Sequence, residues 1–205
     1  MEPNREKVSA TSLRERHKEA TRQELRAAAL RLFQSKGFTQ TSVDDIALAA
    51  GVSRSTFFRY FPSKESVVYG EADDNAEMFV ALLRERPAGE ARMEALEETL
   101  VEFAEQLDSE SRRAETIVTE SVVSAEPSLR ARRAALIATW RENVAQVLAE
   151  RDGRSEPDLE DALASAILSQ MTEQMGAEWR TRRVSVTELI RNYFESLRRL
   201  VHGRS

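Results

Sequence analysis

Residues 41–65 read TSVDDIALAAGVSRSTFFRYFPSKE. Ser42 has the character of an N-cap and opens a two-turn amphipathic segment that ends at Gly51. A second short segment opens at Ser53 and runs to about Phe61. Glycine readily adopts the backbone conformation that a tight turn between two helices needs. The pattern therefore predicts a helix-turn-helix unit.

The second segment has the chemistry of a helix that reads DNA. Phe57 and Phe61 lie four residues apart and can both point inward. The residues left to point outward are Arg54, Ser55, Thr56 and Tyr60. A guanidinium can grip guanine, small hydroxyls allow close approach, and a phenol can reach a phosphate. A purely structural helical corner is the alternative interpretation of the same pattern.

Helical periodicity extends over most of the chain. Upstream, one helix face carries Leu25, Ala28, Ala29, Leu32 and Phe33. Downstream, apolar periods and end signals predict helices over residues 68–86, 93–107, 112–124, 128–151, 157–179 and 186–201. Strand-like alternation is no longer than residues 184–186. We therefore predict an all-α fold of about nine helices.

Composition excludes several classes of protein. The chain has 205 residues, of which 41% are hydrophobic and 32% charged, so it can bury the core of one or two small domains and is not intrinsically disordered. It has no Cys, which removes disulfide scaffolds, thiolate zinc sites and cysteine nucleophiles. Only seven Gly and five Pro are present, which is typical of helices rather than of a turn-rich β-sandwich.

Charge is distributed unevenly along the chain. Residues 1–64 carry twelve Lys and Arg against seven Asp and Glu, whereas the remainder carries eighteen against twenty-eight. A basic module on an acidic body suits a polyanion that binds at one end only. A chance excess on solvated helix faces is the alternative.

The sequence argues against an enzyme and against a membrane protein. The only histidines, His17 and His202, lie near the chain ends, and no glycine-rich phosphate loop is present. Acidic pairs such as Asp44–Asp45 diverge by about 100° on a helix and are poorly aimed at one metal ion. No apolar run reaches the roughly 18 residues of a membrane span, and the N-terminus lacks the pattern of a signal peptide. We expect no metal, no cofactor and a cytoplasmic location.

Together with Leu32-Phe33 and Lys36-Gly37-Phe38, residues 41–65 resemble the TetR family of bacterial transcriptional regulators. The match extends over about residues 22–69. The resemblance implies a homodimeric, ligand-responsive repressor that a small apolar or amphipathic effector releases from a palindromic operator. It also implies three parts: a flexible basic arm (1–18), a helix-turn-helix DNA-binding domain (19–65) and an effector-binding and dimerisation domain (66–205). An all-α protein-protein interaction module without DNA binding is the alternative.

The resemblance also assigns DNA contacts. Ser42, Tyr60 and Lys64 are expected to hold phosphates. Ser53, at the start of the helix, is also expected to bind DNA, and Arg54, Ser55 and Thr56 after it are expected to touch base edges. Phe58 stands where the family usually has a phosphate-binding Tyr, so we expect it to pack or to touch a sugar or thymine methyl. The basic residues of the arm either reach the DNA backbone or only add solubility; they are Arg5, Lys7, Arg14, Arg16 and Lys18.

Two further sets of residues are expected in the helical body. An effector pocket needs apolar walls with a few polar groups; the candidates are Phe79, Leu83, Leu100, Phe103, Ile117, Glu120, Ser121, Trp140, Asn143, Val144, Met171 and Met175. Most of these apolar residues are also candidates for plain core. The last two helices are expected to form a four-helix dimer interface, through Leu163, Ile167, Met171, Leu189, Tyr193, Phe194 and Leu197. Gly70 lies in the helix that follows the DNA-reading helix of residues 53–61. It is interpreted either as a site of close packing or as a point where that helix can bend.

Overall fold

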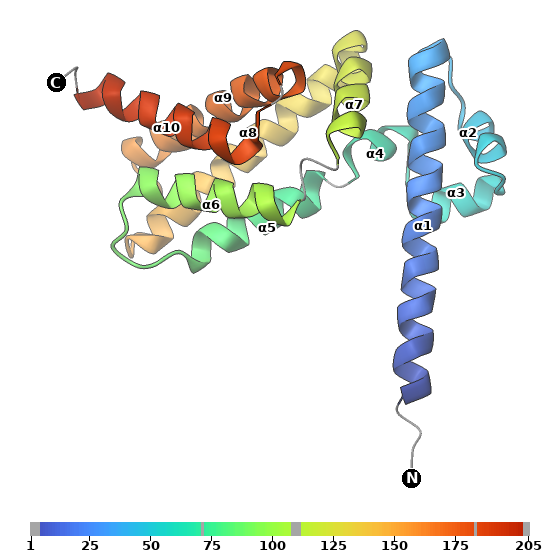
Figure 1. Ribbon diagram of the computed structural model, residues 1–205, viewed down its shortest axis with the longest axis horizontal. Helices are drawn as coiled ribbons and strands as arrows, with labels where there is room; N and C mark the ends of the chain where they lie inside the picture. The colour runs from blue at the N-terminus through green and yellow to red at the C-terminus, as the bar shows by residue number, and fades with distance from the viewer. Residues whose placement is uncertain (1–4, 71, 108–111, 183, 203–205) are drawn as a thin grey trace. The chain divides into compact units, whose positions relative to one another are not determined.

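The computed structural model describes residues 5–70, 72–107, 112–182 and 184–202, and for residues 5–15, 73 and 202 it describes the backbone only. This part of the chain contains helices and no strand, which confirms the all-α prediction (Figure 1). It holds ten helices, in chain order α1 (Arg5–Lys36), α2 (Val43–Ala49), α3 (Arg54–Tyr60), α4 (Lys64–Tyr69), α5 (Ala72–Glu85), α6 (Arg92–Gln106), α7 (Arg113–Ala125), α8 (Pro127–Arg151), α9 (Leu159–Thr181) and α10 (Val186–His202).

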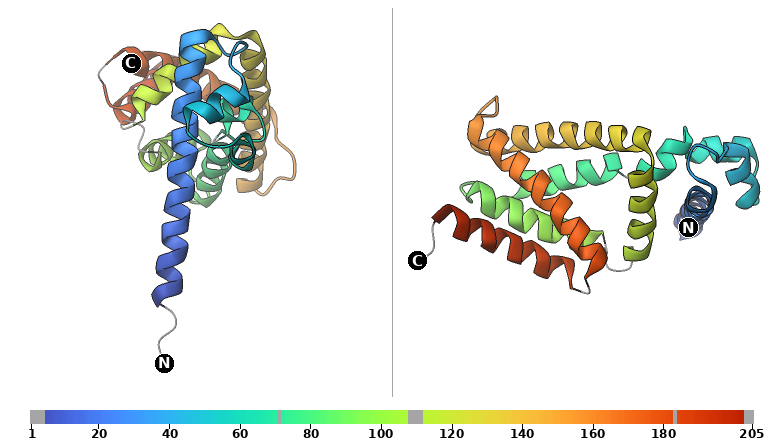
Figure 2. Two further views of the ribbon diagram at one scale, coloured as in Figure 1. Left: turned by 90° about the vertical axis from the view of Figure 1, so that its right-hand side faces the viewer. Right: turned by 90° about the horizontal axis from the view of Figure 1, so that it is seen from above.

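The N-terminal segment differs from the expected flexible arm, because α1 already begins at Arg5. Thr21 and Glu24 have the sequence spacing of a capping box, but Thr21 lies inside α1, and its hydroxyl donates to the carbonyl of His17 at 2.9 Å, one turn earlier. Arg, Lys, Glu and Ala are strong helix formers, and extending an existing helix costs far less than nucleating one. The N-terminal half of α1 extends beyond α2 and α3, as both Figures 1 and 2 show. Residues 1–4 lie outside the described part.

The chain divides into two compact units. Unit 1 comprises residues up to Gly70 together with Val118–Leu129, and unit 2 comprises Glu71–Ile117 and residues from Arg130 onward. The division therefore lies five residues after the expected boundary at Glu65. It also assigns the second half of α7 and the start of α8 to the helix-turn-helix unit, although both were expected in the effector domain.

Unit 1 is built around aromatic and branched side chains. Phe33, Ile46 and Phe57 from α1, α2 and α3 are buried together, and the Phe33 and Phe38 rings lie 4.9 Å apart. Val122, Val123 and Leu129 join the same cluster from the far segment of the chain. Two hydrogen bonds fasten this segment: Thr39 donates to the Glu126 carboxylate at 2.9 Å, and the Tyr69 hydroxyl donates to the Leu129 carbonyl at 2.8 Å.

The single helix expected after α3 is divided into two helices, α4 and α5. Ser63 caps α4 in a reciprocal box with Ser66, and α4 ends at Gly70. Arg22 of α1 donates to the Gly70 carbonyl at 3.2 Å. A Cβ atom at residue 70 would collide with the carbonyl oxygen of Ser66, so only glycine fits without a shift of the backbone. Of the two interpretations of Gly70, the structure supports close packing.

Unit 2 has a separate apolar core. It is formed mainly by Phe79 and Leu83 of α5, Leu96 of α6, Leu148 of α8 and Leu168 of α9. An aromatic chain runs through it, in which the ring centroids of Phe79 and Phe103 are 5.6 Å apart and those of Phe79 and Trp140 are 5.2 Å apart. The buried carboxylate of Glu97 on α6 accepts hydrogen bonds from Arg191 at 3.0 Å and Arg198 at 2.5 Å, which hold α10 against α6.

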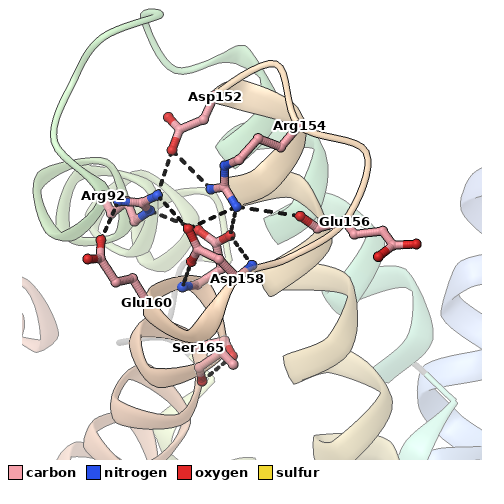
Figure 3. A network of polar contacts seen from close by, with 9 residues as sticks. Arg92, Asp152, Arg154, Glu156, Asp158, Glu160 and Ser165 are labelled. Atoms are coloured by element: carbon pink, nitrogen blue, oxygen red, sulfur yellow. Dashed lines mark hydrogen bonds and ion pairs between the residues drawn. The ribbon is translucent and has the colours of Figure 1, made fainter.

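A cluster of charges fastens the turn between α8 and α9 to the start of α6 (Figure 3). The carboxylate of Asp161 is fully buried and accepts hydrogen bonds from Arg92 at 2.8 Å and Arg154 at 2.6 Å. Asp161 also completes a capping box with Asp158 at the start of α9. Arg92 and Arg154 both reach Asp152 at the surface, as the dashed lines in Figure 3 show.

The ionisation of Asp161 is tied to folding. Burial alone raises the pKa of this carboxyl, but hydrogen bonds from Arg154, the Asp158 backbone N–H and Arg92 outweigh burial and lower the pKa from 3.8 to about 2. A lowered pKa in the folded state means that the charged form favours folding. The contribution of Asp161 to stability is therefore fully present above about pH 4 and is lost as the pH falls through about 2.

No helix among the described residues is both long and apolar enough to span a bilayer.

We predict that Asp161→Ala lowers the free energy of unfolding by about 3 kcal/mol, because two guanidinium groups lose a buried partner. The matched control is Glu160→Ala, which removes the exposed partner of Arg92 at 2.9 Å and should cost less than about 1 kcal/mol. Urea unfolding at pH 7 measures both. Equal losses in the two variants would contradict this account of the charge cluster.

Candidate nucleic-acid interface

The helix-turn-helix forms as its residues predict. Ser42 caps α2 and shares a capping box with Asp45, and Ser53 caps α3 by accepting from the Thr56 backbone N–H at 3.1 Å. Gly51 has φ +67°, a conformation that residues with a Cβ rarely adopt. The Val52 backbone N–H donates to the Ala47 carbonyl at 2.9 Å, which closes the turn.

Phe57 and Phe61 fix the orientation of α3. Both are buried, with exposed fractions of 0% and 1%. These two side chains face the core, and the other side chains of α3 are more accessible: Arg54, Ser55, Phe58 and Arg59 are exposed, and Thr56 and Tyr60 are partly exposed. The structure thus brings the predicted base-reading and phosphate-binding residues of α3 onto the accessible side of one short helix.

The hydroxyl groups at the start of α3 form a compact cluster. The Ser53 hydroxyl lies 2.9 Å from those of both Ser55 and Thr56. Ser42, at the start of α2, is exposed, and its hydroxyl donates to the Asp45 carboxylate at 2.6 Å. Lys36 and Ser42 together hold the pKa of Asp45 far below its usual range, so this carboxyl stays ionised and α2 stays capped.

Arg54 is held by two neighbours. Its Nη1 lies 2.6 Å from the Asp44 carboxylate on α2, and its guanidinium lies 5.3 Å from the centre of the Phe58 ring. The Phe58 ring in turn packs edge-on against the buried Phe57 at 5.5 Å. Arg54 remains largely exposed, so most of its N–H groups can still face a ligand.

Lys64 has a different position from the one expected of a phosphate contact. Its ammonium donates to the backbone carbonyls of Phe38 at 2.9 Å and Thr41 at 3.3 Å, and it lies 4.3 Å from the centre of the Phe38 ring. The side chain therefore holds the start of α4 to the loop between α1 and α2. It is partly buried, and in this position its first role is structural.

Sequence reasoning missed Arg59 and Asp44. Arg59 is exposed on α3 one turn beyond Ser55, with its guanidinium 5.3 Å from the centre of the Tyr60 ring. Its charge and its spacing from Ser55 are the signal that could have identified it. For Asp44, the pairing with Arg54 depends on how two helices pack, so no local pattern announces it.

The structure does not bring all the expected effector-binding residues together. Glu120 and Ser121 belong to unit 1, whereas the other ten belong to unit 2. Ser121 lines a different feature, a cavity of about 220 Å³ within unit 1 that Phe33, Phe38 and Val122 also line. Asn143 and Ile117 are exposed. The apolar candidates that lie in or against the core of unit 2 are Phe79, Leu83, Leu100, Phe103, Trp140, Val144, Met171 and Met175.

Sequence reasoning also missed Thr99 in the body. Its hydroxyl is buried on α6 and has no hydrogen-bond partner within the described part of the chain. The described part of the chain contains no group of three or more His, Cys, Asp or Glu that could hold a metal ion.

Two of the expected dimer residues must be withdrawn. Leu189 and Phe194 are 5% and 1% exposed, because they fill the interior of their own chain and leave no surface for a second one. Leu163 and Ile167 on α9 are exposed, and Met171, Tyr193 and Leu197 are partly exposed. The exposed apolar face includes residues that the prediction omitted, namely Leu159, Leu200 and Val201.

Comparison with known proteins agrees with this architecture. Residues 25–68 match the sequence model of the bacterial regulatory proteins of the tetR family, and residues 90–202, more than half of the chain, match that of the MftR C-terminal domain. The chain is 30% identical over 181 residues to MftR of Mycobacterium tuberculosis, described as a mycofactocin biosynthesis transcriptional regulator; the match covers 88% of this chain and 90% of that protein. The chain belongs to the TetR family.

Two other proteins illustrate how similarity is distributed along the chain. The regulator EthR of Mycolicibacterium smegmatis is 53% identical over 47 residues, which cover 23% of this chain and 22% of EthR. The crystal structure of NalD, the secondary repressor of the MexAB-OprM multidrug efflux pump in Pseudomonas aeruginosa, superposes with a TM-score of 0.60 at 21% identity and covers 90% of this chain and 96% of NalD. The fold is thus shared over about nine-tenths of the chain, whereas the 53% identity to EthR covers less than a quarter of it.

Family membership confirms the main functional prediction. The chain belongs to a family of DNA-binding transcriptional regulators, which are not enzymes. The alternative of a helical interaction module without DNA binding is not favoured, because the match includes the helix-turn-helix itself.

We predict opposite behaviour for Arg54→Ala and Lys64→Ala. Arg54→Ala should leave the melting temperature within about 1 °C of the wild type and weaken duplex binding at least tenfold, because it removes an exposed contact. Lys64→Ala should lower the melting temperature by several degrees, because two carbonyls lose their donor. Thermal melts and fluorescence anisotropy with labelled DNA measure both. A stable Lys64→Ala variant with weakened DNA binding would instead restore Lys64 as a plain phosphate contact.

Proposed function

We propose that the protein works as a homodimeric repressor that binds a palindromic operator in the cytoplasm and is released by a small apolar or amphipathic effector. The observation that carries the proposal is the outward face of α3, where Arg54, Ser55, Phe58 and Tyr60 are accessible while Phe57 and Phe61 are buried. A short helix anchored in this way can be laid into the major groove with its N-terminal residues against base edges.

Each residue of the interface has a role in this proposal. Arg54, Ser55 and Thr56 touch base edges, with the guanidinium directed at guanine. Ser42 and Tyr60 hold phosphates, and Arg59 adds a basic group that the sequence prediction lacked. Phe58 packs against Arg54 and touches a sugar or a thymine methyl. Lys64 does not contact DNA in this proposal; it stabilises the interface by hydrogen bonds to the loop between α1 and α2.

The face for a second copy is proposed on α9 and α10. Leu159, Leu163 and Ile167 follow each other at intervals of four residues on α9 and are 74%, 52% and 37% exposed. On α10, Leu200 and Val201 are 80% and 70% exposed, and Leu197 lies one turn earlier. Two helices with such apolar stripes can pair with their copies in a two-fold four-helix bundle. Dimerisation would place two readers about 34 to 36 Å apart, in successive major grooves.

The effector is proposed to enter unit 2 beside α8. Over residues 130–143 of α8 no side chain is buried, and Leu136, Ile137 and Trp140 are only partly covered. Trp140 and Phe79 offer an aromatic wall that continues to Phe103. An apolar ligand gains by covering such surface. The Thr99 hydroxyl on α6, which has no hydrogen-bond partner among the described residues, supplies a polar group within the same unit.

The continuous helix α7 gives the effect of ligand binding in unit 2 a route to the DNA-reading helix α3. Helix α7 begins in unit 2 and continues, from Val118 onward, in unit 1. There Val122 and Val123 pack in the cluster that contains Phe57. A ligand that moves α7 or α8 would therefore act on the core that orients α3, in addition to any effect through α4. The Thr39–Glu126 hydrogen bond, which lowers the pKa of Glu126, is the polar part of this attachment.

The direct test is selection of bound fragments from a random duplex library with the purified full-length chain. We predict enrichment of an inverted repeat whose half-site centres are about 10 base pairs apart, or a multiple of one helical turn. Arg54→Ala should enrich no repeat or one with altered bases. A thermal-shift screen of apolar carboxylic acids and their thioesters then identifies effector classes. Recovery of no inverted repeat by the wild type would contradict the proposed operator.

A substitution on α9 tests the dimer face. Leu163→Glu places a carboxylate twice in a two-fold apolar interface, so the dimer should dissociate about 100-fold more readily or be lost. Leu48→Glu is the control, since Leu48 is 82% exposed on α2 and away from α9 and α10 in the chain. Sedimentation velocity at micromolar concentration gives the mass of each. A Leu163→Glu variant as dimeric as the control would remove α9 from the interface.

A further inference from the structure

The ion pair between Asp44 and Arg54 joins the two helices of the helix-turn-helix. Asp44 lies in the first turn of α2 and Arg54 in the first turn of α3, and Arg54 Nη1 lies 2.6 Å from Asp44 Oδ2. Both side chains are more than half exposed, at 65% for Asp44 and 58% for Arg54. An exposed pair of this kind contributes little to folding stability. Its position on the base-reading face calls for another explanation.

Asp44 takes no part in capping α2. The neighbouring Asp45 does that work: it accepts from the Ser42 backbone N–H at 2.8 Å and pairs with Lys36 at 2.8 Å. The carboxylate of Asp44 instead points along the surface to Arg54. An acidic group on the face that meets a polyanion is unfavourable for DNA affinity, because it repels phosphates at close range.

Phe58 is the second residue that contacts the Arg54 guanidinium, after Asp44. It lies one turn after Arg54 on α3, and its ring stacks with the guanidinium at 5.3 Å while resting edge-on against the buried Phe57. One edge of the ring thus rests on a residue of the core, although Phe58 itself is 43% exposed. The Asp44 carboxylate on α2 and the Phe58 ring on α3 contact the guanidinium from two directions.

We propose that Asp44 is a specificity-determining residue that positions Arg54. The proposal rests on the proposed function of α3 as the DNA reader. In the free protein Asp44 occupies one edge of the guanidinium and leaves other N–H groups available, and a guanine O6 and N7 pair can engage two of them at once. A phosphate of unrelated DNA can also meet these N–H groups, but it brings a full negative charge close to the Asp44 carboxylate, which repels it.

The consequence is lower affinity for unrelated DNA and greater discrimination for the operator. A free arginine would bind phosphates wherever it met them, and it would lose side-chain freedom when it bound a base. An arginine that is already oriented loses less freedom on binding guanine. Asp44 therefore weakens binding to every sequence through its charge and strengthens the preference for one sequence through Arg54.

The experiment compares Asp44→Asn, Glu65→Gln and the wild type on the selected operator and on an unrelated duplex of equal length. Glu65 is an exposed carboxylate of α4 in the same unit, so Glu65→Gln makes the same charge change away from Arg54. We expect Asp44→Asn to bind the unrelated duplex about fivefold more tightly and to lose about tenfold in the ratio of operator to unrelated affinity. Glu65→Gln should keep the wild-type ratio.

A double substitution separates positioning from charge. If Asp44 acts through Arg54, the double variant Asp44→Asn/Arg54→Ala should have the same ratio of operator affinity to unrelated-duplex affinity as Arg54→Ala alone. A further loss in the double variant, or an equal change of ratio in Asp44→Asn and Glu65→Gln, would overturn the proposal. Failure of the proposed function is recognised separately, because the wild type itself would then show no preference for any duplex.

Discussion

The interface depends on the burial of two phenylalanines, Phe57 within the seven-residue helix α3 and Phe61 at its C-cap. A helix as short as α3 is not stable on its own, because nucleation costs more than so few hydrogen bonds return. Phe57 and Phe61 provide what local propensity cannot, since both are buried in a core to which α1, α2 and α4 contribute. This burial holds α3 together and at the same time decides which of its side chains face outward.

The same core explains why a distant segment belongs to the reader. Val122, Val123 and Leu129 complete the cluster around Phe33 and Phe57, so the first unit depends on residues more than fifty positions downstream. In the proposed mechanism this arrangement gives an effector a route to α3, because helix α7 begins in unit 2 and continues into the core of unit 1.

Much of this architecture could be predicted from sequence, for identifiable reasons. The helix-turn-helix followed from Gly51, from the capping serines and from the spacing of Phe57 and Phe61, all of which are local signals. The Arg92–Asp161 contact, which joins residues 69 positions apart, leaves no local signal. On α10 the apolar period identified the helix but not which side meets a partner, because Phe194, in the core, and Leu197, towards the surface, obey the same period.

The charged pairs of this protein differ in what surrounds them, and the surroundings decide what each can do. Around Asp161 and Glu97, burial makes every lost partner expensive, so these pairs fix helices to one another. Around Asp44 and Arg54, water screens the attraction, so the pair contributes little to the stability of the fold. Such a pair is suited to a recognition surface, where Asp44 can orient the arginine while other N–H groups of the guanidinium remain available to a base.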